Sequence, residues 1–282
     1  MPPMRVLFIL LAILAAVFGL APATARADEV APELERADLR VRAQAELSKL
    51  VATLPEKDKK RLTGVYAAFD PSVADPIAQV ACDDDGDPVV VLSDAMLELL
   101  AHLSRAAASD EGNDSRNVEE YARFLARSQT PGRRLMPPPP GFYAGARAGA
   151  THDPRLRELL AFVIACELTR LRAGDLVCPR PTSTKESGDD VWTDAEQRKA
   201  VETASTVYPG HMMERDEEAL VLLLDDGNSD KGATALLRFF TQFEVERRVA
   251  LGRFTPSYLT LHPSASMRLA NLKRIATEQT SK

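Results

Sequence analysis

The sequence predicts an α+β fold that is dominated by helices and carries a small β-sheet early in the chain. Three short apolar runs, residues 65–69, 77–81 and 88–92, are separated by turn-forming residues and have the composition of strands. After residue 92, apolar residues recur every three or four positions over long stretches, which is the spacing of amphipathic helices. Strands that precede a run of helices are typical of the α+β class.

The predicted helices begin and end at local signals. Pro55 closes the first helix and Pro154 opens the helix at the centre of the chain, because proline fixes φ and has no N–H to donate. Ser93 or Asp94 is the expected N-cap of the helix that follows the third strand. The expected helices cover residues 33–54, 56–62, 94–108, 118–127, 155–173, 195–207, 212–225, 231–251 and 264–278.

Length and composition set the class of molecule. The chain has 282 residues, of which 45% are hydrophobic and 27% charged, so it can bury the core of one globular domain or two. Its formal net charge is −6, and no basic patch is interleaved with aromatic residues. This balance argues against a nucleic-acid-binding protein, because such proteins neutralise phosphates with clustered Lys and Arg.

The N-terminus has the pattern of an export signal. Arg5 supplies a positive charge, residues 6–20 form an apolar core, and Ala25, Arg26 and Ala27 match the small-x-small cleavage site. An apolar run of about 15 residues is short for a membrane span, which needs about 20. We expect a signal peptide at residues 1–27 and a periplasmic or secreted protein; an uncleaved anchor is the alternative. No later stretch is apolar enough to span a membrane.

Export permits disulfides, but the three cysteines leave the pairing open. On one straight helix Cys166 and Cys178 would lie about 18 Å apart at ~1.5 Å per residue, beyond the ~4.4–6.8 Å range between bridged Cα atoms. A chain reversal near Gly174 would allow that pair. Otherwise a bridge involves Cys82, and one thiol stays free.

Two irregular segments interrupt the predicted elements. The acidic string from Asp83 to Asp87 resembles a calcium loop, but the twelfth position holds Asp94 instead of the required Glu and the flanks are strands, so a solvated hairpin turn is favoured. Residues 109–153 contain the four consecutive prolines Pro137 to Pro140, which favour an extended segment. A surface insertion is preferred there over a lid or a partner-docking arm.

The central helix carries a peptidase-like pattern. In the zinc-metallopeptidase motif H-E-x-x-H, two His one turn apart bind zinc and the Glu between them activates the metal-bound water. Here Glu167 stands in the Glu position, but Cys166 replaces the first His and Arg170 the second.

Four segments, taken in chain order, resemble the gluzincin metallopeptidases of the HtpX, BepA and CAAX prenyl protease kind. They correspond to that family's edge strand and following helix, its H-E-x-x-H helix, its E-x-x-A-D helix and its closing H-P-x-x-x-x-R segment. The closing segment matches best, with His262, Pro263 and Arg268 in place. The four segments are residues 86–97, 162–171, 212–227 and 261–274.

The resemblance implies a domain plan and a peptide-binding strand. It implies a helix-dominated metallopeptidase-like (zincin) domain over residues 63–282 with an insertion at 109–153, preceded by a helical segment at 28–62. In the family the edge strand pairs with an extended substrate. Val89, Val90, Val91 and Leu92 are therefore expected to bind a peptide strand through backbone hydrogen bonds.

The family's metal ligands carry over poorly. Glu167 takes the position of the general base, and Cys166 and Arg170 take the positions of the two His ligands. The third ligand falls on Met212 if Asp216 matches the family's Asp. This alignment is favoured, because the number of helix residues before Gly227 then agrees with that of the family. It falls on Glu214 if Glu218 matches that Asp.

Arg170 decides the expectation for the metal. A guanidinium has no lone pair to offer and does not deprotonate in proteins. At ~4 Å and an effective dielectric of ~20 it repels a divalent ion by about 8 kcal/mol. No metal is therefore expected, and Arg170 is expected to form an ion pair with Glu167, Glu214 or Asp216 that joins the helices. Zn²⁺ bound with the help of Cys166 and Glu214 is the alternative.

The predicted function is that of an exported pseudo-peptidase that binds polypeptide or regulates another protein, with Glu167 inactive as a base. The first alternative is an active envelope zinc metalloendopeptidase with altered ligands. A thiol peptidase that pairs Cys166 with His211 or His262 is less favoured, because nothing in the sequence except the family resemblance brings these residues together. A structural protein with an accidental likeness is the last alternative.

Overall fold

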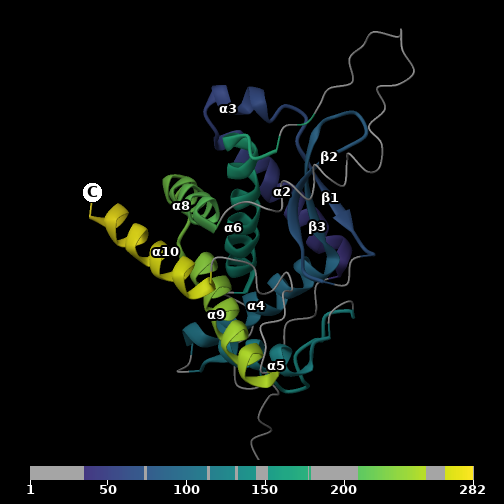
Figure 1. Ribbon diagram of the computed structural model, residues 1–282, viewed down its shortest axis with the longest axis vertical. Helices are drawn as coiled ribbons and strands as arrows, with labels where there is room; N and C mark the ends of the chain where they lie inside the picture. Colours follow the sequence, from purple (N-terminus) through teal and green to yellow (C-terminus); the bar gives the residue numbers. More distant parts are fainter. Residues whose placement is uncertain are drawn as a thin grey trace, which may run out of the picture.

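The computed structural model describes residues 35–72, 75–112, 115–130, 133–143, 152–176, 178, 209–251 and 264–281. The predicted α+β class is confirmed: a three-stranded sheet lies beside a larger set of helices (Figure 1). The predicted signal peptide at 1–27, the predicted helix at 195–207 and His262 lie outside the described residues. Among the helices that the structure describes, none has the length and apolarity needed to cross a membrane.

The described elements follow the predicted order with shifts of a few residues at their ends. The first described helix begins at Arg36, where residue 33 was expected, and the helix that follows the third strand extends beyond its predicted end at Ala108 to Gly112. The elements are α2 (Arg36–Thr53), α3 (Glu56–Arg61), β1 (Tyr66–Asp70), β2 (Ala78–Cys82), β3 (Pro88–Ser93), α4 (Asp94–Gly112), α5 (Asn117–Ser128), α6 (His152–Ala173), α8 (Pro209–Asp225), α9 (Lys231–Leu251) and α10 (Ala265–Thr280).

The sheet has the strand order β1-β3-β2. β3 lies in the middle, parallel to β1 and antiparallel to β2. Its central position explains its composition, because a strand that is paired on both sides and covered by helices is almost continuously apolar. Val90 and Leu92 are fully buried.

The hairpin between β2 and β3 is the acidic turn that the sequence indicated. One carboxylate oxygen of Asp83 accepts hydrogen bonds from the backbone N–H groups of Asp85, at 3.1 Å, and Asp87, at 2.8 Å. Gly86 has φ +78°, a left-handed conformation that glycine adopts without strain. The Asp83 carboxylate therefore serves as a hydrogen-bond acceptor for backbone N–H groups of its own turn.

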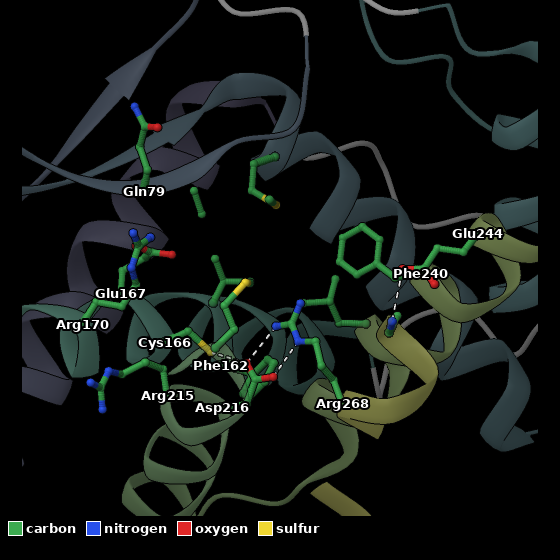
Figure 2. Close-up of a pocket in the computed structure, with 16 residues that line it drawn as sticks. Gln79, Phe162, Cys166, Glu167, Arg170, Arg215, Asp216, Phe240, Glu244 and Arg268 are labelled. Atoms are coloured by element: carbon green, nitrogen blue, oxygen red, sulfur yellow. Dashed lines mark hydrogen bonds and ion pairs between the residues drawn. The ribbon is translucent and has the colours of Figure 1, made fainter. Parts of the chain in front are cut away.

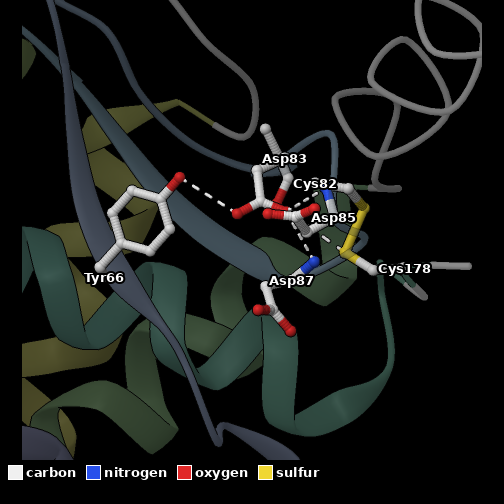
Figure 3. The surroundings of a disulfide bond; sticks show 7 residues. Tyr66, Cys82, Asp83, Asp85, Asp87 and Cys178 are labelled. Carbon is white, nitrogen blue, oxygen red and sulfur yellow. Dashed lines mark hydrogen bonds between the residues drawn. A yellow bond between two sulfur atoms is a disulfide. The ribbon is translucent and has the colours of Figure 1, made fainter. Parts of the chain in front are cut away.

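The disulfide joins this hairpin to the segment that follows α6. Cys82 at the end of β2 pairs with Cys178, with Cα atoms 5.6 Å apart, and Cys166 is the free thiol (Figure 3). The alternative pairing of Cys166 with Cys178 is thus excluded. Tyr66 of β1 donates a hydrogen bond of 3.2 Å to Asp83 beside the bridge.

α6 is the central helix of the molecule. It contacts α2, α4, α8 and α9 as well as β2 and β3, and Figure 1 shows it between the sheet and the C-terminal helices. Most of its side chains are buried, including every residue of the apolar run from Leu159 to Ala165 in its middle. At Gly232 of α9 a Cβ atom would lie 2.5 Å from the backbone of Glu158, so glycine permits the close approach of α9 to α6.

The start of α4 is held by its predicted cap. The Ser93 hydroxyl accepts the backbone N–H of Met96 at 3.1 Å, as an N-cap does. Asp94 in the first turn forms two hydrogen bonds with Arg40 of α2, at 2.9 and 2.7 Å. These contacts fix the strand-to-helix connection that leads from β3 into the helical layer.

α5 belongs to the core, so residues 109–153 are not simply the surface insertion that the sequence analysis preferred. The helix packs against α9 and α4, with Tyr121 and Leu125 fully buried. Buried Arg247 of α9 donates to the backbone carbonyl of Ala126 and to that of Gln129, at 3.1 and 3.0 Å. A cation that satisfies carbonyl groups at a helix C-terminus is favourable, because those groups have no partner within the helix.

Candidate functional site

The second half of α6 lines a cavity of about 190 Å³. Cys166, Glu167 and Arg170 all line it, and Arg170 lies about one helical turn after each of the other two, so that it shares a face with each (Figure 2). The other walls come from the start of β2, from α4, α8 and α9, and from the start of α10. The predicted motif residues Met212, Asp216 and Arg268 are among them.

An ion pair in the cavity joins two of the predicted motifs. Arg268 of α10 holds Asp216 of α8 through two hydrogen bonds, at 2.5 and 2.8 Å. The side chain of Asp216 is only 3% exposed and that of Arg268 14%. A bidentate guanidinium–carboxylate pair fixes both orientation and distance. It therefore fastens α10 to α8, although the two residues are 52 positions apart in the sequence.

Cys166 is tied to the same carboxylate. Its Sγ donates a hydrogen bond of 3.6 Å to Oδ1 of Asp216. Burial raises the pKa of the Cys166 thiol well above its ordinary value, and the negative charge of Asp216 raises it further. The thiol is therefore protonated at neutral pH, which makes it a poor nucleophile.

Glu167 pairs with Arg170, at 2.9 Å between Oε2 and Nη1. This is one of the three partners expected for Arg170. However, both residues lie on α6, so this pair does not join the helices as expected; Arg268 and Asp216 do. Burial raises the pKa of Glu167 even though Arg170 opposes the shift.

Arg215 is a site residue that the sequence analysis missed. It forms hydrogen bonds of 2.9 and 3.2 Å with Asp175, just after the end of α6, and its backbone carbonyl accepts from Thr169 at 3.3 Å. It thus fastens α8 to α6 as Arg268 fastens α10 to α8. An Arg in an acidic helix gave no signal that it would point into the core.

The structure distinguishes between the two possible alignments of the E-x-x-A-D motif. Met212 and Asp216 line the cavity, while Glu214 is exposed and does not. Glu218 is also exposed and pairs with Arg215 on the outer side. The alternative in which Glu214 is a metal ligand is therefore wrong, because its side chain leaves the helix on the other face.

The described side chains do not fit a zinc ion. Zinc needs about four thiolate, imidazole or carboxylate donors. Here Asp216 is engaged by Arg268, and a guanidinium stands in the position of the second imidazole. Nowhere among the described residues do three or more His, Cys, Asp or Glu side chains gather in a way that could hold a metal.

The prediction that Val89 to Leu92 form the peptide-binding edge is wrong. They belong to β3, whose backbone is paired with β1 on one side and β2 on the other. β2 is the outer strand of the described sheet on the side of the cavity, and Ala78 and Gln79 at its start line the cavity. The hydrophobic pattern showed that β3 is a strand but could not give the order of the strands.

The cavity combines an apolar interior with a charged wall. Met96, Phe162, Leu236 and Phe240 contribute apolar surface, and α6, α8 and α10 contribute the ion pairs. Ligand pockets for drug-sized molecules usually measure about 300–1,000 Å³. At about 190 Å³ this cavity is the size of one or two side chains and too small for a drug-sized ligand.

Comparisons with models of protein families, with curated proteins and with solved structures found no match for the chain. What the protein does must therefore be inferred from the residues of the site and their geometry.

Proposed function

We propose that the protein is an exported pseudo-peptidase: a metallopeptidase-like domain without a metal, which binds polypeptide instead of cleaving it. One observation carries the proposal. The cavity brings together residues of three of the resembling segments, Glu167 and Arg170 of α6, Asp216 of α8 and Arg268 of α10, and these residues form ion pairs where the family's metal site would lie.

Convergence of the motifs supports the peptidase-like frame. The sequence resemblance assigned Asp216 and Arg268 to separate motifs without placing them in contact. Their bidentate contact in one cavity with the degenerate H-E-x-x-H turn is unexpected if the likeness is accidental.

Electrostatics support the absence of a metal. Structural zinc is bound by about 10–16 kcal/mol in favourable peptides. Repulsion from one guanidinium at ~4 Å removes about 8 kcal/mol of this at an effective dielectric of ~20, and replacing an imidazole by arginine also removes a ligand. Arg215 and Arg268 add two further guanidinium groups to the same cavity.

A comparison of the two outer strands, β1 and β2, supports polypeptide binding on the β2 side of the sheet, next to the cavity. On β1 the backbone N–H of Ala67 donates to the Gln44 side chain of α2 at 3.0 Å, so this edge is blocked at that point. β2 instead borders the cavity, whose apolar interior would receive a side chain of an extended peptide.

Metal analysis and a digestion assay test the proposal. Purified protein is incubated with one equivalent of ZnCl₂, desalted, and analysed for zinc; its cleavage of fluorescent casein is followed with and without a chelator. We expect neither stoichiometric zinc nor cleavage. One zinc per chain with cleavage that the chelator abolishes would establish the alternative, an active envelope zinc metalloendopeptidase.

Polypeptide binding has its own test. Fluorescence anisotropy of labelled unfolded casein should rise on addition of the protein, and Phe240→Glu in the cavity should weaken binding at least about tenfold. Val245→Glu on the same helix is the matched control, because Val245 is exposed and does not line the cavity. Equal effects of the two substitutions would exclude the cavity as the binding site.

A further inference from the structure

The four prolines that follow Met136 form an exposed strap whose two ends are anchored in the core. Tyr121 of α5 donates a hydrogen bond of 3.0 Å to the backbone carbonyl of Met136, and the Gln129 amide oxygen accepts the N–H of Met136 at 3.1 Å. Beyond the prolines, Tyr143 donates to the carbonyl of His102 at 3.0 Å. The strap, residues 134–140, is thus held at both ends.

The sequence of the strap favours an extended conformation. Proline fixes φ near −65°, and a residue before proline is pushed towards the β or polyproline II region. Four consecutive prolines therefore favour a polyproline II helix, with three residues per turn and no internal hydrogen bonds. No helix or strand is present from residue 134 to 139, and Gly141 with φ +77° reverses the chain after the strap.

Burial along the strap follows this three-residue period. Leu135 is 4% exposed, and Pro138, three positions on, is half-buried, so this face packs on the protein. Arg134, Pro137 and Pro140 share another face, and all three are exposed. The exposed face therefore presents arginine, proline and proline at intervals of three residues.

We propose that residues 134–140 are a preformed polyproline ligand that docks on a partner domain with an aromatic-lined groove and an acidic rim. Such grooves recognise P-x-x-P segments, because the polyproline II helix is already ordered and loses little entropy on binding. The acidic rim is assigned from Arg134, whose side chain is 74% exposed and lies one turn before Pro137. Its ion pair with Glu98, at 2.9 Å, is a surface contact that a partner carboxylate can replace.

Anchoring distinguishes the strap from a flexible proline-rich linker. A linker must be ordered when it binds, and that ordering lowers its affinity. Here the contacts of Tyr121, Gln129 and Tyr143 have already ordered the segment. The intact protein should therefore bind a polyproline-recognising groove at least as tightly as the same segment binds when it is a free peptide.

The probe for the test is a purified SH3 domain that binds R-x-x-P-x-x-P peptides, titrated calorimetrically with the whole protein and with a synthetic peptide of residues 133–142. We expect both to bind, the protein at least as tightly as the peptide. Pro137→Ala and Arg134→Ala in the protein should each weaken binding about tenfold, which is ~1.4 kcal/mol.

Arg133→Ala is the matched control, because Arg133 is exposed next to Arg134 but lies outside the three-residue register. It should change affinity by less than about twofold, or ~0.4 kcal/mol. Thermal unfolding of each variant checks that the fold is kept. The proposal is overturned if the protein does not bind, whether or not the peptide does, or if Arg133→Ala and Arg134→Ala weaken binding equally.

Discussion

Two arginine–carboxylate pairs share the cavity, and they differ in what they connect. Arg268 and Asp216 join two helices through two hydrogen bonds, with Asp216 almost fully buried. Arg170 and Glu167 are neighbours on one helix, joined at 2.9 Å, and burial still raises the pKa of Glu167. The first pair therefore stabilises the arrangement of the helices, whereas the second mainly keeps two charged groups compatible with a buried position.

In the proposed pseudo-peptidase, ion pairs hold together the helices that a bound metal ion would otherwise join. Here Arg268 and Arg215 make the interhelical contacts, to Asp216 and Asp175. Arg170 pairs with Glu167 on its own helix, and its positive charge opposes the binding of a metal ion.

The largest effect is predicted for Asp216→Asn. The substitution removes the carboxylate charge that pairs with the guanidinium of Arg268, and removing one partner of a buried pair typically costs about 3–5 kcal/mol. Urea denaturation should show this loss in the free energy of unfolding.

A double-mutant cycle sharpens the prediction for this pair. The double variant Asp216→Asn/Arg268→Met should lose clearly less free energy of unfolding than the sum of the losses in the two single variants. The reason is that Arg268→Met removes the guanidinium whose carboxylate partner Asp216→Asn has already removed. Strictly additive losses would contradict an energetic coupling between Asp216 and Arg268.

A kinetic effect is predicted for Cys166. Because burial raises the pKa of its thiol, the native protein should react with Ellman's reagent at pH 8 far more slowly than the protein in 6 M guanidinium. One thiol per chain should react in denaturant without reductant, since Cys82 and Cys178 are bridged. Rapid reaction of the native thiol would argue for an activated cysteine and revive the thiol-peptidase alternative.

The smallest effect on stability is predicted for Glu167→Gln. Because the pKa of Glu167 is raised in the folded state above its ordinary value of 4.5, the protonated carboxyl is favoured there. Its contribution to stability is fully present below pH 4.5 and is lost as pH rises through the folded pKa. The glutamine variant lacks this loss, so at pH 7 it should be as stable as the wild type or slightly more stable.

The pH dependence of the stability difference between Glu167→Gln and wild type isolates the contribution of Glu167 from that of other buried acids. Glu46 and Asp110 also have raised pKa values, but they act equally in both proteins and cancel in the difference. The stability difference between Glu167→Gln and wild type should therefore grow in favour of the variant from pH 4.5 upwards. A variant that becomes progressively less stable than wild type over that range would show that the ion pair with Arg170 outweighs burial.

Local patterns in the sequence predicted the elements well, and long-range contacts poorly. Proline, glycine and capping residues such as Ser93 located the helices and strands to within a few residues, because these signals act through the adjacent backbone. The order of the strands was not predictable, because an apolar run such as Val89 to Leu92 is compatible with either an edge or a central strand. The partner of Cys82 was equally open, since it depends on where the chain returns after α6.

The site was predictable only where a motif fixed the spacing. Cys166, Glu167 and Arg170 follow from helical geometry, and Met212, Asp216 and Arg268 follow from the resemblance. Arg215 and the apolar wall from α9 had no such signal, because amphipathic spacing shows that a residue is buried but not what it contacts. For the same reason the choice between Met212 and Glu214 needed the structure, which places them on different faces of α8.

The most direct test of the central claim is the zinc stoichiometry of the wild type beside that of Cys166→His/Arg170→His/Met212→Glu, measured by mass spectrometry of folded, desalted protein. If ion pairs have replaced a metal in a retained zincin-like frame, the wild type should hold no zinc and the triple variant about one ion per chain. One zinc per wild-type chain, or a correctly folded triple variant that binds none, would contradict the account.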